Sequence, residues 1–149
     1  MIGYWDTHGY PNLITTSDAL LMSVRAEIES LMSTYGAKLA NTNIPPTMCA
    51  YFTGKNYIGA DGFAVKFKDY PNILPIDLLS AEIYFDNPCL LGFHTYFGAP
   101  HMTTAIGYGV IDNVEYAVVR DTYSSTEADR WVELSESDWL ISFTPPNLS

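Results

Sequence analysis

The sequence predicts an α+β domain in which N-terminal helices pack on a C-terminal antiparallel β-sheet. The order of its hydrophobic patterns supports this, because helical spacing dominates up to residue 88 and strand patterns dominate after residue 100. A length of 149 residues suits one domain, and 48% of the residues are apolar while 16% are charged. A chain of this composition buries a substantial core and is not disordered.

Helices are expected in three places before residue 88. Residues 1–5 are apolar and aromatic, which indicates the back half of a buried helix whose front half precedes Met1. Residues 15–18 offer N-cap side chains and Gly36 offers a left-handed stop, so a long helix is expected between them. A further helix begins at Pro75. The apolar face of the long helix comprises Leu20, Val24, Ile28, Leu31, Met32 and Tyr35.

The segment between the helices is less regular. Residues 37–48 are expected to form a connection, because they are rich in Asn and Thr and contain two adjacent prolines. Residues 49–52 fit either a short strand or the start of a helix. A loop is expected at residues 54–62, and the alternation of residues 63–68 then predicts a strand with its aromatic residues on one face.

Strands fill the rest of the chain. The apolar run at residues 89–93 indicates a fully buried strand. Residues 101–110 and 114–121 are expected to pair as a hairpin, because Asp-Asn between them favours a tight turn. Two more short strands are expected at residues 131–134 and 139–143.

Charge and cysteine content exclude several classes of function. The formal net charge is -10, which argues against a nucleic-acid partner and against an anionic membrane surface. No apolar run reaches transmembrane length, and no basic segment of a signal peptide is present. The two cysteines form no Cys-x-x-Cys motif, so no zinc site is expected. They could pair as a disulfide, although a domain with an adequate core does not require one. No cofactor is expected, because the chain also has no Gly-rich phosphate loop.

A histidine and an aspartate stand at corresponding ends of the expected hairpin. His101 begins the first strand and Asp121 ends the second, so the two side chains can meet across the ladder. An imidazole oriented by a carboxylate is a common general base in hydrolases. The pattern therefore indicates a catalytic pair, although two unrelated polar residues near loops would give the same spacing.

Four segments resemble bacterial C39-like peptidase domains, which have the papain-like cysteine proteinase fold. Residues 1–12, MIGYWDTHGYPN, are similar to the Met-x-x-Gly-Tyr-Trp/Tyr-Asp segment that ends the family's central helix. Residues 80–93, SAEIYFDNPCLLGF, resemble its helix and the Asn/Arg-Pro-Val-Leu-Leu strand that follows. The segments HMTTAIGY at 101–108 and YAVVRDTY at 116–123 resemble its His-x-x-x-x-x-Gly-Tyr strand and its Val-x-Asp-Pro/Thr-aromatic strand end. The resemblance implies a single, N-terminally truncated domain over residues 1–149.

The resemblance also implies roles for individual residues. His101 would be the general base of a cysteine peptidase that hydrolyses peptide bonds, and Asp121 would orient its imidazole. His94 and Tyr123 are expected to contact the peptide or protein substrate, and a capping or loop role is the alternative for His94. The family's nucleophilic cysteine, in a Cys-x-Pro-Thr-type motif, is expected about two turns of helix before Met1. The family further suggests a secreted or cell-envelope location.

Neither cysteine of this chain is expected to replace that nucleophile. Cys89 lies in an apolar run, where a thiol is expected to be buried with a raised pKa. Cys49 could be more exposed, but Pro46-Thr47-x-Cys49 reverses the order of the family motif. An alternative is therefore a catalytically inactive papain-fold module that binds an extended peptide or a neighbouring domain. A homo-oligomer in which another protomer supplies the missing helix is a third reading.

Overall fold

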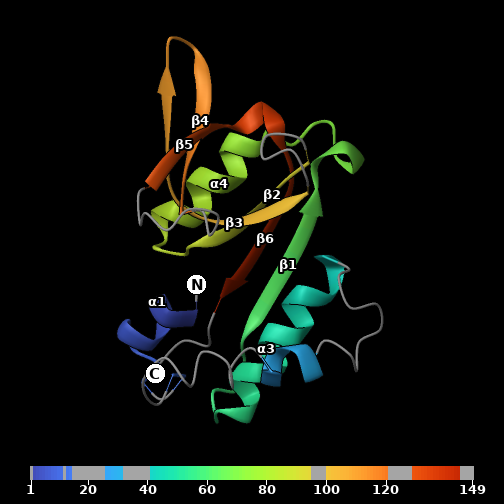
Figure 1. The fold of residues 1–149 in the computed structure, drawn as a ribbon, viewed down its shortest axis with the longest axis vertical. Coiled ribbons are helices and arrows are strands. Elements are labelled where there is room, and N and C mark those ends of the chain that lie inside the picture. Colours follow the sequence, from blue (N-terminus) through green and yellow to red (C-terminus); the bar gives the residue numbers. More distant parts are fainter. Residues whose placement is uncertain are drawn as a thin grey trace. The chain divides into compact units, whose positions relative to one another are not determined.

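The computed structural model describes residues 2–11, 13–14, 26–31, 41–94, 100–120 and 129–144. The protein is an α+β structure that contains a six-stranded antiparallel sheet with the strand order β1-β6-β2-β3-β4-β5 (Figure 1). The chain divides into two compact units. The first unit comprises residues 1–64 and 143–149, and the second unit comprises residues 65–142.

Helices dominate the first unit. Helix α1 spans Ile2–Thr7 and confirms the helix expected at the start of the sequence. Residues 26–31 are helical, as expected for the long helix, whose other residues lie outside the described part of the chain. A short 3-10 helix at Asn41–Asn43 leads into α3, Ile44–Gly54.

The expectation of a connection up to residue 48 was wrong, because α3 begins at Ile44. Pro45 and Pro46 stand in its first turn, where the missing proline N–H groups would have no intrahelical partner anyway. The two prolines therefore start a helix here. The open choice between strand and helix for residues 49–52 is settled in favour of helix.

Aromatic side chains form the core of the first unit. Trp5 of α1 packs edge-on against Tyr10, with ring centroids 5.9 Å apart, and Tyr10 packs edge-on against Phe52 of α3 at the same distance. The Tyr51 hydroxyl donates a hydrogen bond of 2.6 Å to the backbone oxygen of Leu13, and both residues are buried. These contacts hold the segment after α1 against α3.

The second unit begins within β1, Asp61–Lys66. The strand expected over residues 63–68 begins and ends two residues earlier, so the loop expected at residues 54–62 stops before Asp61, and a 3-10 turn at Phe67–Asp69 follows Lys66. The backbone N–H of Tyr70 closes this turn on the oxygen of Phe67. Phe67 is buried, whereas Phe63 is exposed, so the expected common aromatic face was also wrong. Helix α4, Pro75–Tyr84, then begins at its proline as expected.

The remaining strands agree closely with the sequence pattern. They are β2 (Cys89–Phe93), β3 (His101–Ile111), β4 (Val114–Arg120), β5 (Asp129–Glu133) and β6 (Ser137–Thr144). The β3–β4 turn places Asp112 and Asn113 at φ 50° and 63°, which is the left-handed geometry of a two-residue hairpin. Asp and Asn adopt that region more readily than most residues.

The core of the second unit lies between α4 and the sheet. Leu79 of α4 and Leu91 and Phe93 of β2 are almost fully buried in it. The Ser142 hydroxyl of β6 donates a hydrogen bond to the Glu82 carboxylate of α4, which ties the helix to the centre of the sheet. The helix and sheet thus present the end of β2 and the start of β3 on a rigid support.

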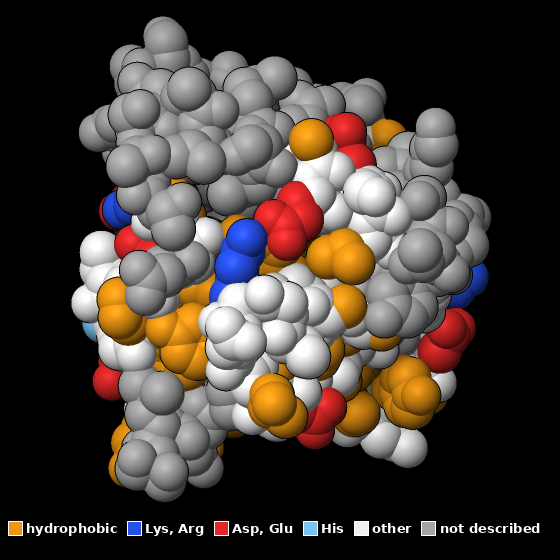
Figure 2. Space-filling model, turned by 90° about the horizontal axis from the view of Figure 1, so that it is seen from below, with side chains coloured by type: hydrophobic (Ala, Val, Ile, Leu, Met, Phe, Trp, Pro, Cys, Tyr) orange, Lys and Arg blue, Asp and Glu red, His pale blue; other side chains and the backbone are white. Residues whose placement is uncertain are grey.

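The described residues include no helix that is both long and apolar enough to span a membrane. Hydrophobic side chains reach the surface at several separate places on the face of the molecule shown in Figure 2. Exposed apolar residues also occur in the β3–β4 hairpin, among them Val110 and Ile111.

Candidate functional site

His101 is the first residue of β3 and lies opposite Phe93, the last residue of β2. Phe93 is almost completely buried, so this end of the strand pair is anchored in the core. His101 itself is half-buried, and its Nε2 atom is inaccessible to solvent. An imidazole held in this way at the end of a central strand has a restricted orientation, which a general base requires.

His94 follows β2 directly and lies near Asp138 of β6. The His94 Nδ1 atom is 3.3 Å from an Asp138 carboxylate oxygen, and the two side chains are 71% and 42% exposed. The register of β2 on β6 shifts between Gly92 and Phe93, so Asp138 is the extra residue of a β-bulge. A pair this exposed contributes little to stability.

Asp138 has no local signal in the sequence. It meets His94 only because β6 pairs with β2, and these strands are separated by three others along the chain. The bulge cannot be read from the alternation of residues 137–144, because it depends on the register against β2.

Asp121 and Tyr123 lie outside the described residues, which end in this part of the chain at Arg120. Arg120 lies opposite Thr104 of β3, and its Nε atom is 3.2 Å from a carboxylate oxygen of Asp129 on β5. The hairpin that was expected to bring Asp121 toward His101 is therefore confirmed as far as Arg120. The pairing of His101 with Asp121 stays a prediction.

The structure separates Cys89 from His101. Cys89 lies opposite Ala105, four residues along β3 from His101. The separation is on the order of 13 Å at about 3.3 Å per residue, whereas proton transfer needs contact within about 3 Å. Burial, with a smaller effect of the Glu82 charge, raises the pKa of the Cys89 thiol from 9.0 to about 12. The expectation that Cys89 is buried with a raised pKa is confirmed.

Cys49 is also poorly suited to nucleophilic attack. Its side chain is half-buried in α3, and burial followed by the negative charge of Asp61 raises the pKa of its thiol. A raised pKa leaves less thiolate at neutral pH, and the thiolate is the reactive form. Both cysteines are free of disulfide bonds.

The described part of the chain contains no group of three or more His, Cys, Asp or Glu residues arranged to hold a metal ion. The site consists of His101 on β3, His94 after β2 and Asp138 on β6, all at one end of the sheet's central strands. Comparisons with protein-family models, with curated proteins and with solved structures found no match for this chain.

Proposed function

We propose that this chain carries the base-bearing part of a papain-like cysteine peptidase active site of the C39-like type. The observation that carries the proposal is the position of His101 at the first residue of a central strand, with its Nε2 atom buried. The four sequence segments that resemble the family support it. So does the α+β architecture, in which α4 precedes β2 and an antiparallel sheet follows.

The proposed reaction begins with a cysteine thiol that gives its proton to His101. The thiolate attacks the carbonyl carbon of a peptide bond, and the imidazolium then protonates the leaving amine as a thioester forms. A water molecule, deprotonated by the same imidazole, hydrolyses the thioester and regenerates the thiol. Asp121 would accept a hydrogen bond from the buried Nε2 of His101 and stabilise the imidazolium.

By the resemblance to the family, the nucleophile is proposed to be a cysteine about two helical turns before Met1. The raised pKa values of Cys49 and Cys89 support a nucleophile from outside these two positions. His94, whose Nδ1 atom lies 3.3 Å from an Asp138 carboxylate oxygen, is proposed to contact the substrate. Tyr123 is proposed as a second contact for the substrate.

The test uses the protein together with the residues encoded directly before Met1. This longer protein should cleave a mixture of fluorogenic peptides. His101→Ala should reduce kcat by about 10²-fold or more, which is the usual contribution of a general base. His8→Ala is the matched control, because His8 is an exposed histidine in the turn after α1. Equal loss in both variants, or cleavage that does not depend on His101, would contradict the proposal. An upstream sequence without cysteine would contradict it as well.

A second candidate is a catalytically inactive module that binds an extended peptide. Strand β5 favours it, because this strand stands at the edge of the sheet, where an extended peptide can add a further strand. Slower amide hydrogen exchange at residues 129–133 on peptide addition, with no cleavage in the presence of a competent thiol, would favour this function over the peptidase.

A further inference from the structure

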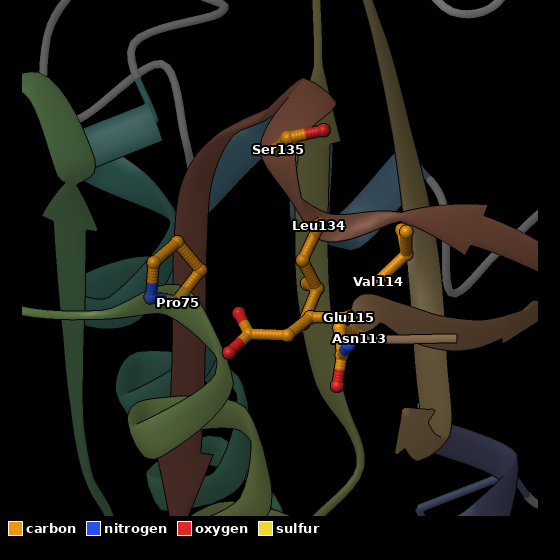
Figure 3. A pocket seen from close by; sticks show the side chains of 6 residues that line it. All are labelled: Pro75, Asn113, Val114, Glu115, Leu134 and Ser135. Carbon is orange, nitrogen blue, oxygen red and sulfur yellow. The ribbon is translucent and has the colours of Figure 1, made fainter. Parts of the chain in front are cut away.

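A pocket of about 280 Å³ lies on the second unit, away from the residues of the candidate site. The hairpin turn and β4 form one side, the 3-10 turn at Leu134–Glu136 another, and the first residue of α4 a third (Figure 3). Its volume is just below the lower end of the usual range for small-molecule sites, so it suits one side chain better than a larger ligand. The residues that line it are Pro75, Asn113, Val114, Glu115, Leu134 and Ser135.

Glu115 is the one charged residue among those that line the pocket. Figure 3 shows its carboxylate extending from β4 toward Pro75, across the pocket. The side chain is half-buried, and within the described ranges it has no ion pair and no hydrogen bond. A half-buried carboxylate that faces a pocket can pair with a cation that enters the pocket.

The side chains that line the pocket suit an organic cation better than a metal ion. One carboxylate, one amide and one hydroxyl supply too few oxygen ligands for Ca²⁺, which takes six to eight. Pro75, Val114 and Leu134 provide apolar contacts that suit an alkyl stem, and Asn113 and Ser135 provide further hydrogen-bonding groups. An arginine or lysine side chain combines an apolar stem with a charged head in this way.

Exposed apolar side chains near the pocket point to a protein as the source of that cation. Val110 is paired with Glu115 across the hairpin and is 62% exposed, and Leu74, next to Pro75, is 54% exposed. A free amine would leave both uncovered, whereas a peptide segment would bury them. The net charge of -10 favours a basic partner and disfavours a second copy of this chain.

We propose that this pocket, the Glu115 pocket, binds an arginine or lysine side chain from a basic segment of a partner protein, with Val110 and Leu74 covered by flanking apolar residues of that segment. The proposal is independent of catalysis at His101. Glu115 also faces the first turn of α4, where a carboxylate is favoured by the helix dipole. A role limited to that turn is the competing explanation that the experiment must separate.

The experiment titrates the protein with the peptide acetyl-Gly-Leu-Arg-Leu-Gly-amide and follows the backbone amide signals of Asn113, Glu115 and Ser135 by NMR. A peptide with citrulline in place of arginine, and arginine amide alone, are titrated in parallel. The arginine peptide should shift the three signals and bind at least about tenfold more tightly than either control, because each control lacks the charge or the flanking apolar groups. Equal binding by citrulline, equal binding by arginine amide, or no shift at these signals would each overturn the proposal.

Variants then assign the binding to the pocket. Glu115→Gln should weaken binding of the arginine peptide about tenfold, whereas Asp69→Asn, which removes a carboxylate on the exposed turn after β1, should leave it unchanged within about twofold. Ser135 lines the pocket from an exposed position, so Ser135→Tyr should fill the pocket and abolish binding of the arginine peptide. This variant tests the proposal if Glu115→Gln does not fold. A Glu115→Gln protein that melts at lower temperature but binds the peptide as before would show a role at α4 alone and refute the proposal.

Discussion

Gly92 in β2 tolerates little added volume, because it lies between β3 and β6, the strands that carry His101 and Asp138. It pairs with Met102 of β3 and with Trp139 of β6. A Cβ atom at this position would lie 3.2 Å from the Trp139 Cβ and 3.4 Å from the terminal carbon of Met102. The methionine end can move aside, but the tryptophan Cβ is fixed by the β6 backbone. Gly92→Ala therefore forces the strands apart by a few tenths of an ångström.

Overpacking of this kind destabilises the folded state by about 1–3 kcal/mol. Replacing glycine by alanine also stabilises the protein by about 0.4–1 kcal/mol, because it lowers the conformational entropy of the unfolded chain. We expect Gly92→Ala to lower the free energy of unfolding by about 1–2 kcal/mol. Gly107→Ala in β3 is the matched control, because its Cβ would lie 3.4 Å from the Val118 Cβ, an ordinary contact. We expect that variant to be neutral or more stable by up to about 1 kcal/mol.

Urea unfolding followed by tryptophan fluorescence measures both changes, provided that the dependence on urea concentration is the same for all three proteins. The fluorescence of Trp139 reports on the region around Gly92, since Trp139 contacts that position. A difference between the two variants below about 0.5 kcal/mol would show that β2 and β6 are not in the described register. Such a result would also remove the support for the His94–Asp138 contact, which depends on the same pairing.

Two further changes test the interior of each unit. Tyr51→Phe should lower the free energy of unfolding by about 2 kcal/mol, because it leaves the buried Leu13 carbonyl without its hydrogen-bond donor. The control is Tyr57→Phe, since the Tyr57 hydroxyl donates its hydrogen bond to the Pro11 oxygen at an exposed position. In the same urea titration, this control should change the free energy of unfolding by less than about 0.5 kcal/mol. Equal losses would contradict the assigned burial. Because the folded state raises the pKa of Cys89 from 9.0 to about 12, its contribution to stability is full below pH 9 and is lost as the pH rises toward 12. Thermal melts between pH 8 and 12 should therefore show a smaller alkaline loss for Cys89→Ala than for the unaltered protein, and parallel curves would refute this.

The sequence predicted the features that depend on local patterns. The hairpin followed from Asp112 and Asn113, whose side chains tolerate the left-handed backbone that the turn requires. Helix α4 followed from its initial proline and its apolar spacing, and β2 followed from its continuous apolar run. The position of His101 at the start of β3 followed from the same hairpin.

Features that depend on tertiary context escaped prediction. Pro45 and Pro46 favour a loop and the first turn of a helix equally well, and the aromatic core around α3 decided for the helix. The contact between His94 and Asp138 depends on a bulge between strands that are distant in the chain. The Glu115 carboxylate, which has no ion pair or hydrogen bond among the described residues, has no signal either, since a glutamate in an alternating strand is ordinarily a solvated residue.

The central claim is that His101 is the general base of a thiol active site. Its most direct test is the rate of iodoacetamide alkylation at pH 5.5 in the protein that includes the residues encoded before Met1, because an ordinary thiol is almost entirely protonated there. We expect the upstream cysteine to be alkylated at this pH and His101→Ala to slow the reaction by more than about tenfold, with Cys49 and Cys89 unlabelled in both proteins. Alkylation at a rate that is independent of His101, or His101-dependent labelling of Cys49 or Cys89, would contradict the claim.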